Sequence, residues 1–457
     1  MRVLHVITGL GIGGAEQQLR LLLRELPLEC HVVTLTDPGP VAAGLRADGV
    51  RVTHLGMSGN RDLTALPRLT SLIRKGRYDL VHTHLYRACV YGRIAARLAG
   101  AGAVVATEHS LGATQIEGRP LTFGTRALYR ATERLGSGTL AVSATVERRL
   151  GAWGVPARRL RLAPNGIDPA VFRHREQARA ATRARLALPD DAFVFGGVGR
   201  QVAAKKFDVL IRAVADLPGA HLLLVGDGPE RIPLLRLIQD LGVAGRIRLA
   251  DRADSSADLA ELLGAMDLFV SLSAEETFGL AVVEALAAGL PARYVSCPAV
   301  EDLPPEEAPG ARRMELSELP AVLRAEQASG PHRLPVPAAV ERYHIARTAE
   351  QVMALYATAL GRAGTALPAQ ATTGPARGAE AATPGRPTRT ADAVPHPAAA
   401  PASPRPAEHT GQAGQAGQAG QAGQADDAEH AGTVDQAASA ASAASAATTA
   451  SAGTVEK

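Results

Sequence analysis

Aromatic residues and cysteines are scarce in this chain, and both shortages limit what it can be. Phe, Trp and Tyr make up 3% of the 457 residues, so the cores must be built from Ala, Val and Leu. The three cysteines, Cys30, Cys89 and Cys297, lie far apart and lack metal-ligand spacing. Without paired cysteines or a signal peptide, the sequence favours a reducing, cytoplasmic location.

Long apolar runs and a strong charge imbalance are missing as well. No run approaches the roughly 18 apolar residues that a membrane-spanning helix needs, so membrane contact is expected to be peripheral only, at the inner face. The formal net charge of +4 is small for this length and does not indicate a nucleic-acid partner. Lysine is rare beside arginine, which draws attention to the adjacent pair Lys205 and Lys206.

The first part of the chain alternates short apolar runs with amphipathic ones. The expected strands are Val3–Thr8, His31–Thr36, Val50–Leu55, Asp79–Thr83, Ala103–Thr107 and Thr139–Val142. The expected helices between them include Ala15–Leu26, Arg87–Ala99 and Phe123–Leu135. Alternation of strands and helices predicts a parallel sheet covered on both faces.

The same pattern restarts after Pro164-Asn-Gly-Ile-Asp-Pro169, which we interpret as a hinge. The expected strands are Phe193–Val198, Ala220–Val225, Arg246–Leu249 and Asp267–Leu272, and the expected helices are Lys205–Asp216, Pro229–Leu241, Ser256–Ala265 and Leu280–Ala288. The sequence thus predicts two α/β domains, 1–165 and 166–344, and a C-terminal helix within 345–361. Residues 362–457 contain no Phe, Trp, Tyr or Ile, and their composition predicts a disordered tail.

A glycine-rich turn, Gly9-Leu-Gly-Ile-Gly-Gly-Ala-Glu16, follows the first expected strand. Glycines allow backbone amides to approach a ligand closely, and the N-terminus of the following helix favours an anion. Gly9, Gly11 and Gly14 also fit the dinucleotide pattern G-x-G-x-x-G, with Asp37 after the second strand. A nicotinamide-dependent oxidoreductase is therefore a rival interpretation, and a ligand-free tight turn is another.

Two cations follow the first strand of the second domain, in Gly199-Arg-Gln-Val-Ala-Ala-Lys-Lys206. Parallel α/β sheets bind ligands at the carboxyl ends of their strands, which places Arg200 and Lys205 at the mouth of a cleft. A helix N-terminus disfavours cations because of its own dipole, so cations there suit a bound polyanion. The plainer alternative is a solvated start of a helix.

Two glutamates flank a Phe-Gly pair in Glu276-Thr-Phe-Gly-Leu-Ala-Val-Val-Glu284. Glu276 falls after an expected strand and Glu284 in the next helix, with Gly279 permitting a sharp entry into that helix. Carboxylates in these places can accept hydrogen bonds from vicinal sugar hydroxyls, although a single glutamate near a helix start is commonly a solvated charge. Phe278 suits packing better than ligand contact.

These elements together resemble the retaining glycosyltransferases of family 4, which have the GT-B fold. The resemblance extends over about residues 1–361, and its matching pieces are Gly13-Gly-Ala-Glu16, Pro164-Asn-Gly-Ile-Asp168, Gly199-Arg200 with Lys205, Gly226-Asp-Gly-Pro229, and Glu276 with Glu284. It implies two Rossmann-like domains facing a cleft. After Gly289-Leu-Pro291 the sequence departs from the family pattern, and we expect the end of the second domain to be trimmed or rearranged.

The resemblance also implies roles for individual residues. Gly13 and Gly14 would face the diphosphate and sugar of a nucleotide-sugar donor, and Arg200 and Lys205 would stabilise the leaving diphosphate. Glu276 would contact the donor sugar and Glu284 the ribose, with Phe278 and Gly279 between them in the donor-binding element. His109, in Thr107-Glu-His-Ser110, resembles the active-site histidine of the family; a lone histidine after a strand is otherwise structural.

The implied reaction needs no cofactor and no metal. The chain contains no Asp-x-Asp triplet, the usual metal-diphosphate anchor of the other glycosyltransferase fold. The resemblance implies transfer of a sugar to an unknown acceptor hydroxyl on a glycan, glycolipid or small molecule, as in cell-envelope polysaccharide synthesis. A sugar-nucleotide epimerase and a non-catalytic scaffold with the tail as a binding arm are the further alternatives.

The segment Arg119–Arg161 holds nine arginines against Glu133 and Glu147. One hypothesis is that this part of the acceptor-side domain meets anionic lipid headgroups or a lipid-linked acceptor. The composition favours the plainer interpretation, a solvated surface in a chain that uses arginine throughout.

Overall fold

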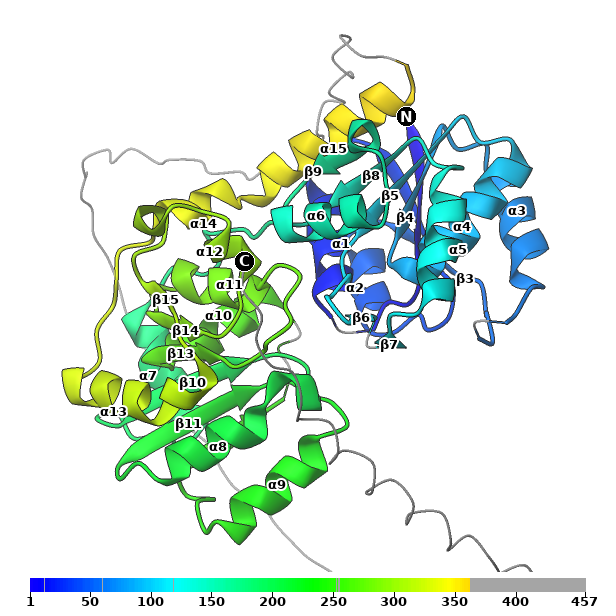
Figure 1. The fold of residues 1–457 in the computed structure, drawn as a ribbon. Helices are drawn as coiled ribbons and strands as arrows, with labels where there is room; N and C mark the ends of the chain where they lie inside the picture. The colour runs from blue at the N-terminus through cyan, green and yellow to red at the C-terminus, as the bar shows by residue number, and fades with distance from the viewer. Residues whose placement is uncertain (12, 60, 118, 252, 254, 362–457) are drawn as a thin grey trace, which may run out of the picture. The chain divides into compact units, whose positions relative to one another are not determined.

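The structure, a computed structural model, describes residues 1–361 except 12, 60, 118, 252 and 254. The described chain forms two parallel sheets, each with helices on both faces (Figure 1). This confirms the predicted α/β class with two Rossmann-like units. The predicted tail, 362–457, lies outside the described residues. Within the described residues, no helix combines the length and the apolar character that crossing a membrane requires.

The first sheet has seven strands in the order β3-β2-β1-β4-β5-β8-β9, and every neighbouring pair is parallel. Its strands are β1 (Arg2–Ile7), β2 (Glu29–Thr34), β3 (Arg51–His54), β4 (Leu80–His84), β5 (Ala103–Glu108), β8 (Gly138–Ala141) and β9 (Leu160–Leu162). A small hairpin, β6 (Gln115–Ile116) with β7 (Arg119–Pro120), follows β5. The order is that of a Rossmann sheet.

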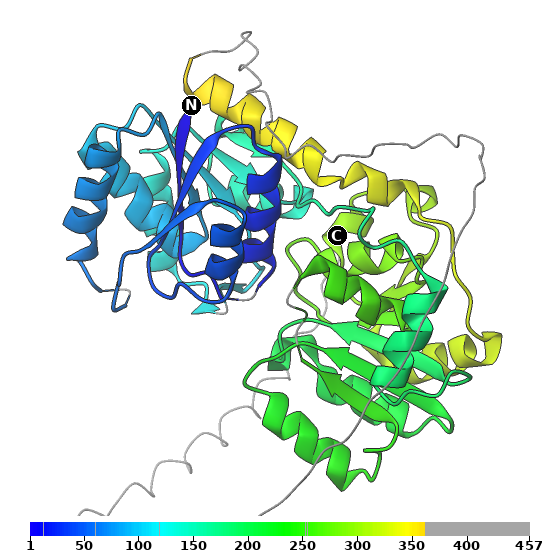
Figure 2. The ribbon, with the colours of Figure 1, turned by 180° about the vertical axis from the view of Figure 1, so that it is seen from behind.

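Helices cover both faces of the first sheet because its strands are apolar on both sides. They are α1 (Gly14–Glu25), α2 (Val41–Ala47), α3 (Ala65–Gly76), α4 (Tyr86–Ala99), α5 (Phe123–Glu133) and α6 (Ala144–Ala152). Alternate residues of one strand enter different cores: Val3 and Ile7 pack with α1 and α2, whereas Leu4 and Val6 pack with α3 and α4. Figure 2 shows α1 and α2 together on one side of this sheet.

The second sheet has six parallel strands in the order β12-β11-β10-β13-β14-β15. They are β10 (Phe193–Val198), β11 (Ala220–Val225), β12 (Ile247–Ala250), β13 (Leu268–Ser271), β14 (Ala292–Tyr294) and β15 (Ala311–Arg313). The first four were expected. The segment that departs from the family pattern still adds β14 and β15, so the sheet continues through strands of three residues each.

The helices of the second half are α7 (Glu176–Arg185), α8 (Phe207–Ala215), α9 (Arg231–Asp240), α10 (Ser256–Gly264), α11 (Leu280–Ala287), α12 (Pro298–Glu301), α13 (Leu319–Ser329), α14 (Ala338–Arg342) and α15 (Ile345–Ala359). The last of these, α15, packs on the first sheet, where Val352, Leu355 and Tyr356 join the core beside α1. Helix α15 therefore belongs to the core of the first domain.

Two segments that connect the halves run side by side. The Ile167 amide donates to the Tyr343 carbonyl at 2.8 Å, and the Ile345 amide donates to the Ile167 carbonyl at 2.8 Å. The Gln18 side chain of α1 holds the same segment, accepting from the Gly166 amide at 2.8 Å and donating to the Gly166 carbonyl at 2.6 Å. The expected hinge is thus fixed at its centre by buried hydrogen bonds to α1.

The strand order reverses once in each sheet, between β1 and β4 in the first and between β10 and β13 in the second. Ligands of open parallel sheets bind beyond the carboxyl ends of the strands at such reversal points, where neighbouring loops part in opposite directions. The loops after β1, β10 and β13 carry most of the residues singled out from the sequence.

Candidate functional site

The loop after β10 places Lys205 in a short 3-10 turn, Ala203–Lys205, and not in a helix. Lys206 takes a left-handed conformation with φ 51°, and α8 begins only at Phe207. The predicted helix start at Lys205 is therefore wrong, and the dipole argument does not apply to this side chain. Lys205 instead forms an ion pair with Glu276, from the loop after β13. The two strands that flank the reversal point thus bring these two charges together.

Close backbone packing joins the loops after β10 and β11. Gly226 has φ 146°, and a Cβ on it would overlap the Gly199 carbonyl oxygen. The Gln201 side chain donates to the Gly226 carbonyl at 2.8 Å, and the Gly199 amide donates to Val225 at 3.0 Å. The first glycine of Gly226-Asp-Gly-Pro229 is needed because the close approach of the Gly199 backbone leaves no room for a side chain.

The loop around Glu276 is held by residues of the first domain on both sides of that glutamate. Glu275 accepts a hydrogen bond from Thr114 Oγ1 at 2.6 Å. The Thr277 hydroxyl donates to the His109 carbonyl at 2.7 Å, and Ser143 Oγ donates to the Thr277 carbonyl at 2.6 Å. We call these three hydrogen bonds the loop clamp. They fix the backbone from which Glu276 reaches Lys205.

The glycine turn lies at the start of α1, as expected. Gly13 is the N-cap residue in an extended conformation, and Gly14 is the first residue of the helix. A Cβ on Gly13 would overlap the carboxyl group of Glu16. Burial raises the pKa of Glu16 to about 7, and the positive charge of Arg200 opposes that rise. The Arg200 side chain is exposed, and its charge acts on the Glu16 carboxyl group.

Gly279 and Glu284 stand at the start and in the second turn of α11. Gly279 caps the helix with φ 96°, and a Cβ there would overlap the Cys297 sulfur. Burial raises the pKa of Glu284 to about 8. No described residue is hydrogen-bonded to this carboxyl group, which suits a group kept for a ligand.

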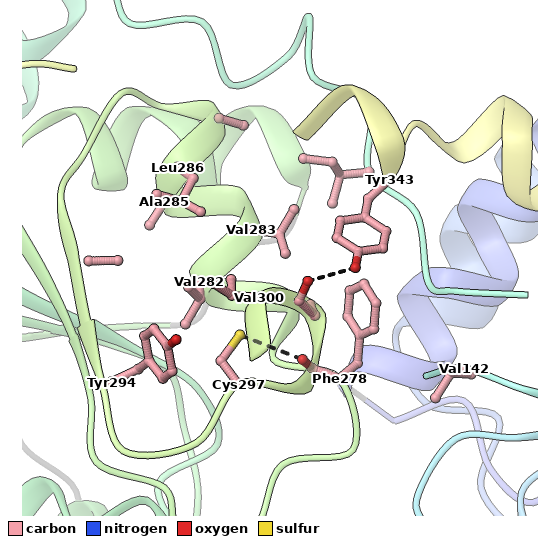
Figure 3. Close-up of a cluster of buried hydrophobic side chains, with 14 of the residues drawn as sticks. Val142, Phe278, Val282, Val283, Ala285, Leu286, Tyr294, Cys297, Val300 and Tyr343 are labelled. Carbon is pink, nitrogen blue, oxygen red and sulfur yellow. Dashed lines mark hydrogen bonds between the residues drawn. The ribbon is translucent and has the colours of Figure 1, made fainter. Parts of the chain in front are cut away.

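Phe278 lies in the core, which confirms that this side chain is suited to packing (Figure 3). Its side chain is 2% exposed and meets the Tyr343 ring edge-on, with 5.0 Å between the ring centroids. Its carbonyl accepts from the Ala299 amide at 2.8 Å and faces the Cys297 thiol at 3.6 Å. Phe278 anchors the loop that carries Glu276, and it does so by packing.

His109 directly follows β5, and its carbonyl is an anchor of the loop clamp. Burial lowers the pKa of its ring to about 4, and the neighbouring Asn165 side chain opposes that shift. The ring is therefore neutral near pH 7. Behind it, burial raises the pKa of Glu108 to about 7.

Sequence reasoning missed two groups at this site. The loop clamp depends on Thr114, Ser143 and Thr277, ordinary hydroxyl residues that carry no motif. The second group is three buried histidines, His5, His82 and His84, of which His5 and His84 are linked to His109 by hydrogen bonds. The alternation His82-Thr-His84 in an otherwise apolar strand was a signal for that group, because alternate strand residues share a face.

We predict that Glu284→Gln stabilises the protein increasingly as the pH rises from 5 to 8. The folded pKa, about 8, lies above the ordinary value of 4.5, so the folded wild-type protein binds the proton more tightly and loses stability as the pH rises through this range. Glutamine has no such penalty. Thermal unfolding should show a gain equivalent to at least about 1 kcal/mol at pH 8 and a smaller one at pH 5. Glu25→Gln, on an exposed residue of α1, is the control; a Glu284→Gln gain that does not depend on pH contradicts the prediction.

Comparison with known proteins agrees with this arrangement. Residues 12–171 match the family described as Glycosyltransferase Family 4, and residues 178–300 match Glycosyl transferases group 1. The crystal structure of Anabaena Alr3699/HepE in complex with UDP and glucose superposes with a TM-score of 0.68 at 22% identity, covering 78% of this chain and 100% of that one. The likeness to this structure shows that the fold is GT-B.

Curated relatives match over part of their length. The Rhizobium meliloti (strain 1021) lipopolysaccharide core biosynthesis glycosyltransferase LpsE is 46% identical over 112 residues, which is 24% of this chain and 32% of that protein. D-inositol 3-phosphate glycosyltransferase 1 of Catenulispora acidiphila is 32% identical over 274 residues, 53% of this chain and 64% of that protein. The chain thus spans about a third to two thirds of these relatives. With both halves matched, the chain belongs to the family 4, group 1 glycosyltransferases.

Proposed function

We propose that this protein transfers a sugar from a nucleoside-diphosphate sugar to an acceptor hydroxyl, with retention of configuration at the anomeric carbon. The observation that carries the proposal is the Lys205–Glu276 ion pair at the reversal point of the second sheet. It joins a cation suited to a diphosphate and a carboxylate suited to sugar hydroxyls. Arg200, from the same loop as Lys205, adds a second positive charge, which acts on Glu16 in the first domain.

In the proposed reaction, the bond between the anomeric carbon and the diphosphate oxygen breaks as the acceptor oxygen attacks from the same face. The acceptor proton passes to an oxygen of the departing diphosphate, so no protein nucleophile is required. Negative charge builds up on that diphosphate, where Arg200 and Lys205 and the amides of Gly13 and Gly14 would stabilise it. Charges placed in advance act most strongly where charge develops in the transition state.

The carboxylates would orient the donor. Glu276 would accept hydrogen bonds from the sugar, and Glu284 from the ribose, for which the free carboxyl group on α11 is suited. Donor binding would replace the Lys205–Glu276 pair with contacts to the diphosphate and the sugar. Two protein cations can supply the charge that a metal ion supplies elsewhere, so we propose that no metal is needed.

UDP-sugars are the first donors to test, because the structure of Anabaena HepE holds UDP and glucose. The names of the curated relatives suggest a lipopolysaccharide core or an inositol phosphate as acceptor classes. A thermal-shift series with UDP-, GDP- and ADP-glucose measures the donor preference, since a ligand that binds only the folded state raises the melting temperature.

We predict that Lys205→Ala and Glu276→Ala each lower the turnover of the preferred donor at least about tenfold, which corresponds to about 1.4 kcal/mol of transition-state stabilisation. Release of the nucleoside diphosphate is the measurement. Lys206→Asn is the matched control: it removes the neighbouring charge, and asparagine tolerates the left-handed backbone at this position. Wild-type turnover in both alanine variants would contradict these roles, whereas no turnover in the wild type or any variant would favour a non-catalytic scaffold.

A second proposal concerns the acceptor side, where α5 presents an exposed basic and aromatic face. Phe123 is 88% exposed at the start of this helix, and Arg126, Arg130 and Arg134 are exposed along and just beyond it. The opposite face is buried through Tyr129 and Thr132. Basic side chains attract anionic lipid, and an exposed aromatic ring can enter the interface, so we propose peripheral contact of α5 with a membrane that holds a lipid-linked acceptor.

We predict that the protein sediments with vesicles containing phosphatidylglycerol and not with phosphatidylcholine alone. Phe123→Ala combined with Arg130→Ala and Arg134→Ala should weaken sedimentation at least about fivefold, given about 1 kcal/mol for each basic residue near an anionic surface. Arg24→Ala, an exposed arginine on α1, is the control. Equal sedimentation of the wild type with both lipids, or none with either at low salt, would contradict membrane contact through α5.

A further inference from the structure

Two helices begin at the reversal point of the first sheet, and their N-termini differ in what they offer a ligand. Helix α1 follows β1 and helix α4 follows β4, and these two strands are neighbours in the sheet. The first turn of a helix leaves backbone amides without partners and therefore attracts an anion. At α1 this anion is the donor diphosphate of the proposed reaction. At α4 the chain supplies the anion itself.

Helix α4 has no capping side chain of its own. Its N-cap residue, Leu85, is apolar and takes φ 73° and ψ 156°, a conformation that is rare outside glycine. A carboxylate reaches this place from the turn between β6 and β7, where Glu117 Oε1 lies 3.5 Å from Thr8 Oγ1. Thr8 directly follows Ile7, which pairs with His84 at the end of β4, and α4 begins two residues later. Glu117 is therefore at the edge of the sheet where α4 begins.

The amides of α4 act on this carboxylate. Burial raises the pKa of Glu117, and the Tyr86 amide, the first of the helix, is the strongest of the groups that oppose the rise. The charges of Arg87 and Arg119 and the Arg87 amide oppose it further. Amides lower the pKa of a carboxyl group when they stabilise its ionised form. Glu117 thus takes the position that an external anion would occupy at the start of α4.

A second carboxyl group close to Glu117 has an oxygen without a partner. Glu108 ends β5 and is fully buried. Its Oε1 accepts from the Ser110 amide at 3.2 Å, whereas its Oε2 has no hydrogen-bond partner among the described residues. After burial, the charge of Glu117 contributes most to the raised pKa of Glu108, so the two groups are neighbours. Carboxyl oxygens of this kind accept from hydroxyl groups and repel a phosphate.

The hairpin holds Glu117 in this position. Ile116 pairs with Arg119 across the turn, and Glu117 between them takes a left-handed conformation with φ 50°. A phosphate could pair with Arg87 and Arg119 only if the Glu117 carboxylate moved away from them. These two arginines make a phosphate the competing occupant of the start of α4.

We propose that Glu117 determines acceptor specificity: its carboxylate fills the anion position of α4, accepts hydrogen bonds from acceptor hydroxyls and excludes a phosphate group. The acceptor class rests on the proposed function, whereas the exclusion of phosphate does not. The acceptor then presents a sugar or polyol face without a phosphate at α4. The start of α1 stays with the donor diphosphate, because there the charge of Arg200 acts on Glu16.

The direct test follows the Tyr86 backbone amide in the full chain labelled with 15N-tyrosine, while inorganic phosphate replaces chloride at constant ionic strength and pH 8. Tyr86→Phe identifies the resonance. In the wild type this amide should not respond to phosphate, because Glu117 occupies its place. In Glu117→Gln the resonance should shift with saturation, and phosphate should bind at least about tenfold more tightly than to the wild type. The gain should persist when Lys205→Ala removes a cation of the second domain.

Glu147→Gln is the matched control, because it removes an acid from the first turn of α6, away from the reversal point; Tyr86 should stay unresponsive to phosphate. If Glu117→Gln does not fold, Glu117→Asn removes the same charge, and asparagine tolerates the left-handed backbone. A saturable response of the Tyr86 amide in the wild type overturns the proposal. So does the absence of a response in a folded variant without the Glu117 charge.

Turnover supplies the second measurement. With UDP-glucose as donor, inositol should accelerate UDP release by the wild type more than inositol 3-phosphate does, and Glu117→Gln should lower that preference at least about fivefold. Greater acceleration by inositol 3-phosphate in the wild type overturns the acceptor class. If the wild type releases no UDP from any tested donor, the proposed function fails while the Tyr86 result still stands.

Discussion

The clamp on the loop from Glu275 to Thr277 is the contact on which the arrangement of the site depends. The loop follows β13, at the reversal point of the second sheet, yet its neighbours Thr114, Ser143 and the His109 carbonyl belong to the first domain. Glu276 lies between two clamped residues and meets Lys205. Both halves of the chain therefore contribute to the position of one carboxylate, and opening the domains would release it.

Burial shifts the pKa values of several other groups around the site. It keeps the histidines behind the site neutral and raises the pKa values of Glu16 and Glu284 to about 7 and about 8. Such shifts arise where solvent is displaced, and there charges and dipoles act more strongly than in water. A carboxyl group that is costly to ionise in the free protein is retained at Glu284, which is the pattern expected where stability is given up for a binding site.

The sequence predicted the elements with strong periodicity, and it failed where structure depends on distant contacts. Parallel strands such as Phe193–Val198 are continuous apolar runs and were placed with the bounds that the structure has. The sequence predicted that a helix begins at Lys205, two residues before α8 begins in the structure. No local signal in the sequence shows that Lys206 takes a left-handed conformation, which separates Lys205 from the helix. Phe278 lies within the motif expected to bind a ligand, but its ring packs in the core against Tyr343, which lies 65 positions later in the sequence.

The loop clamp and the buried histidines beside His109 could not be found by motif. Their partners lie far apart in the sequence, such as Thr114 and Glu275 or His5 and His84, and hydroxyls and histidines of this kind occur in any domain. Even so, two histidines on one face of a buried strand are unusual enough to predict a polar network. The sequence did not show that the partner of this network on β1 is His5.

The most direct test of the loop clamp compares the turnover of Thr277→Val with that of Thr277→Ser. Valine has nearly the shape of threonine but cannot donate to the His109 carbonyl, whereas serine can. If the clamp positions Glu276, Thr277→Val releases UDP from UDP-glucose about tenfold more slowly, Thr277→Ser recovers most of the rate, and UDP raises the melting temperature of both equally. Wild-type turnover in a folded Thr277→Val protein would contradict the claim that the first domain holds the loop in its working position.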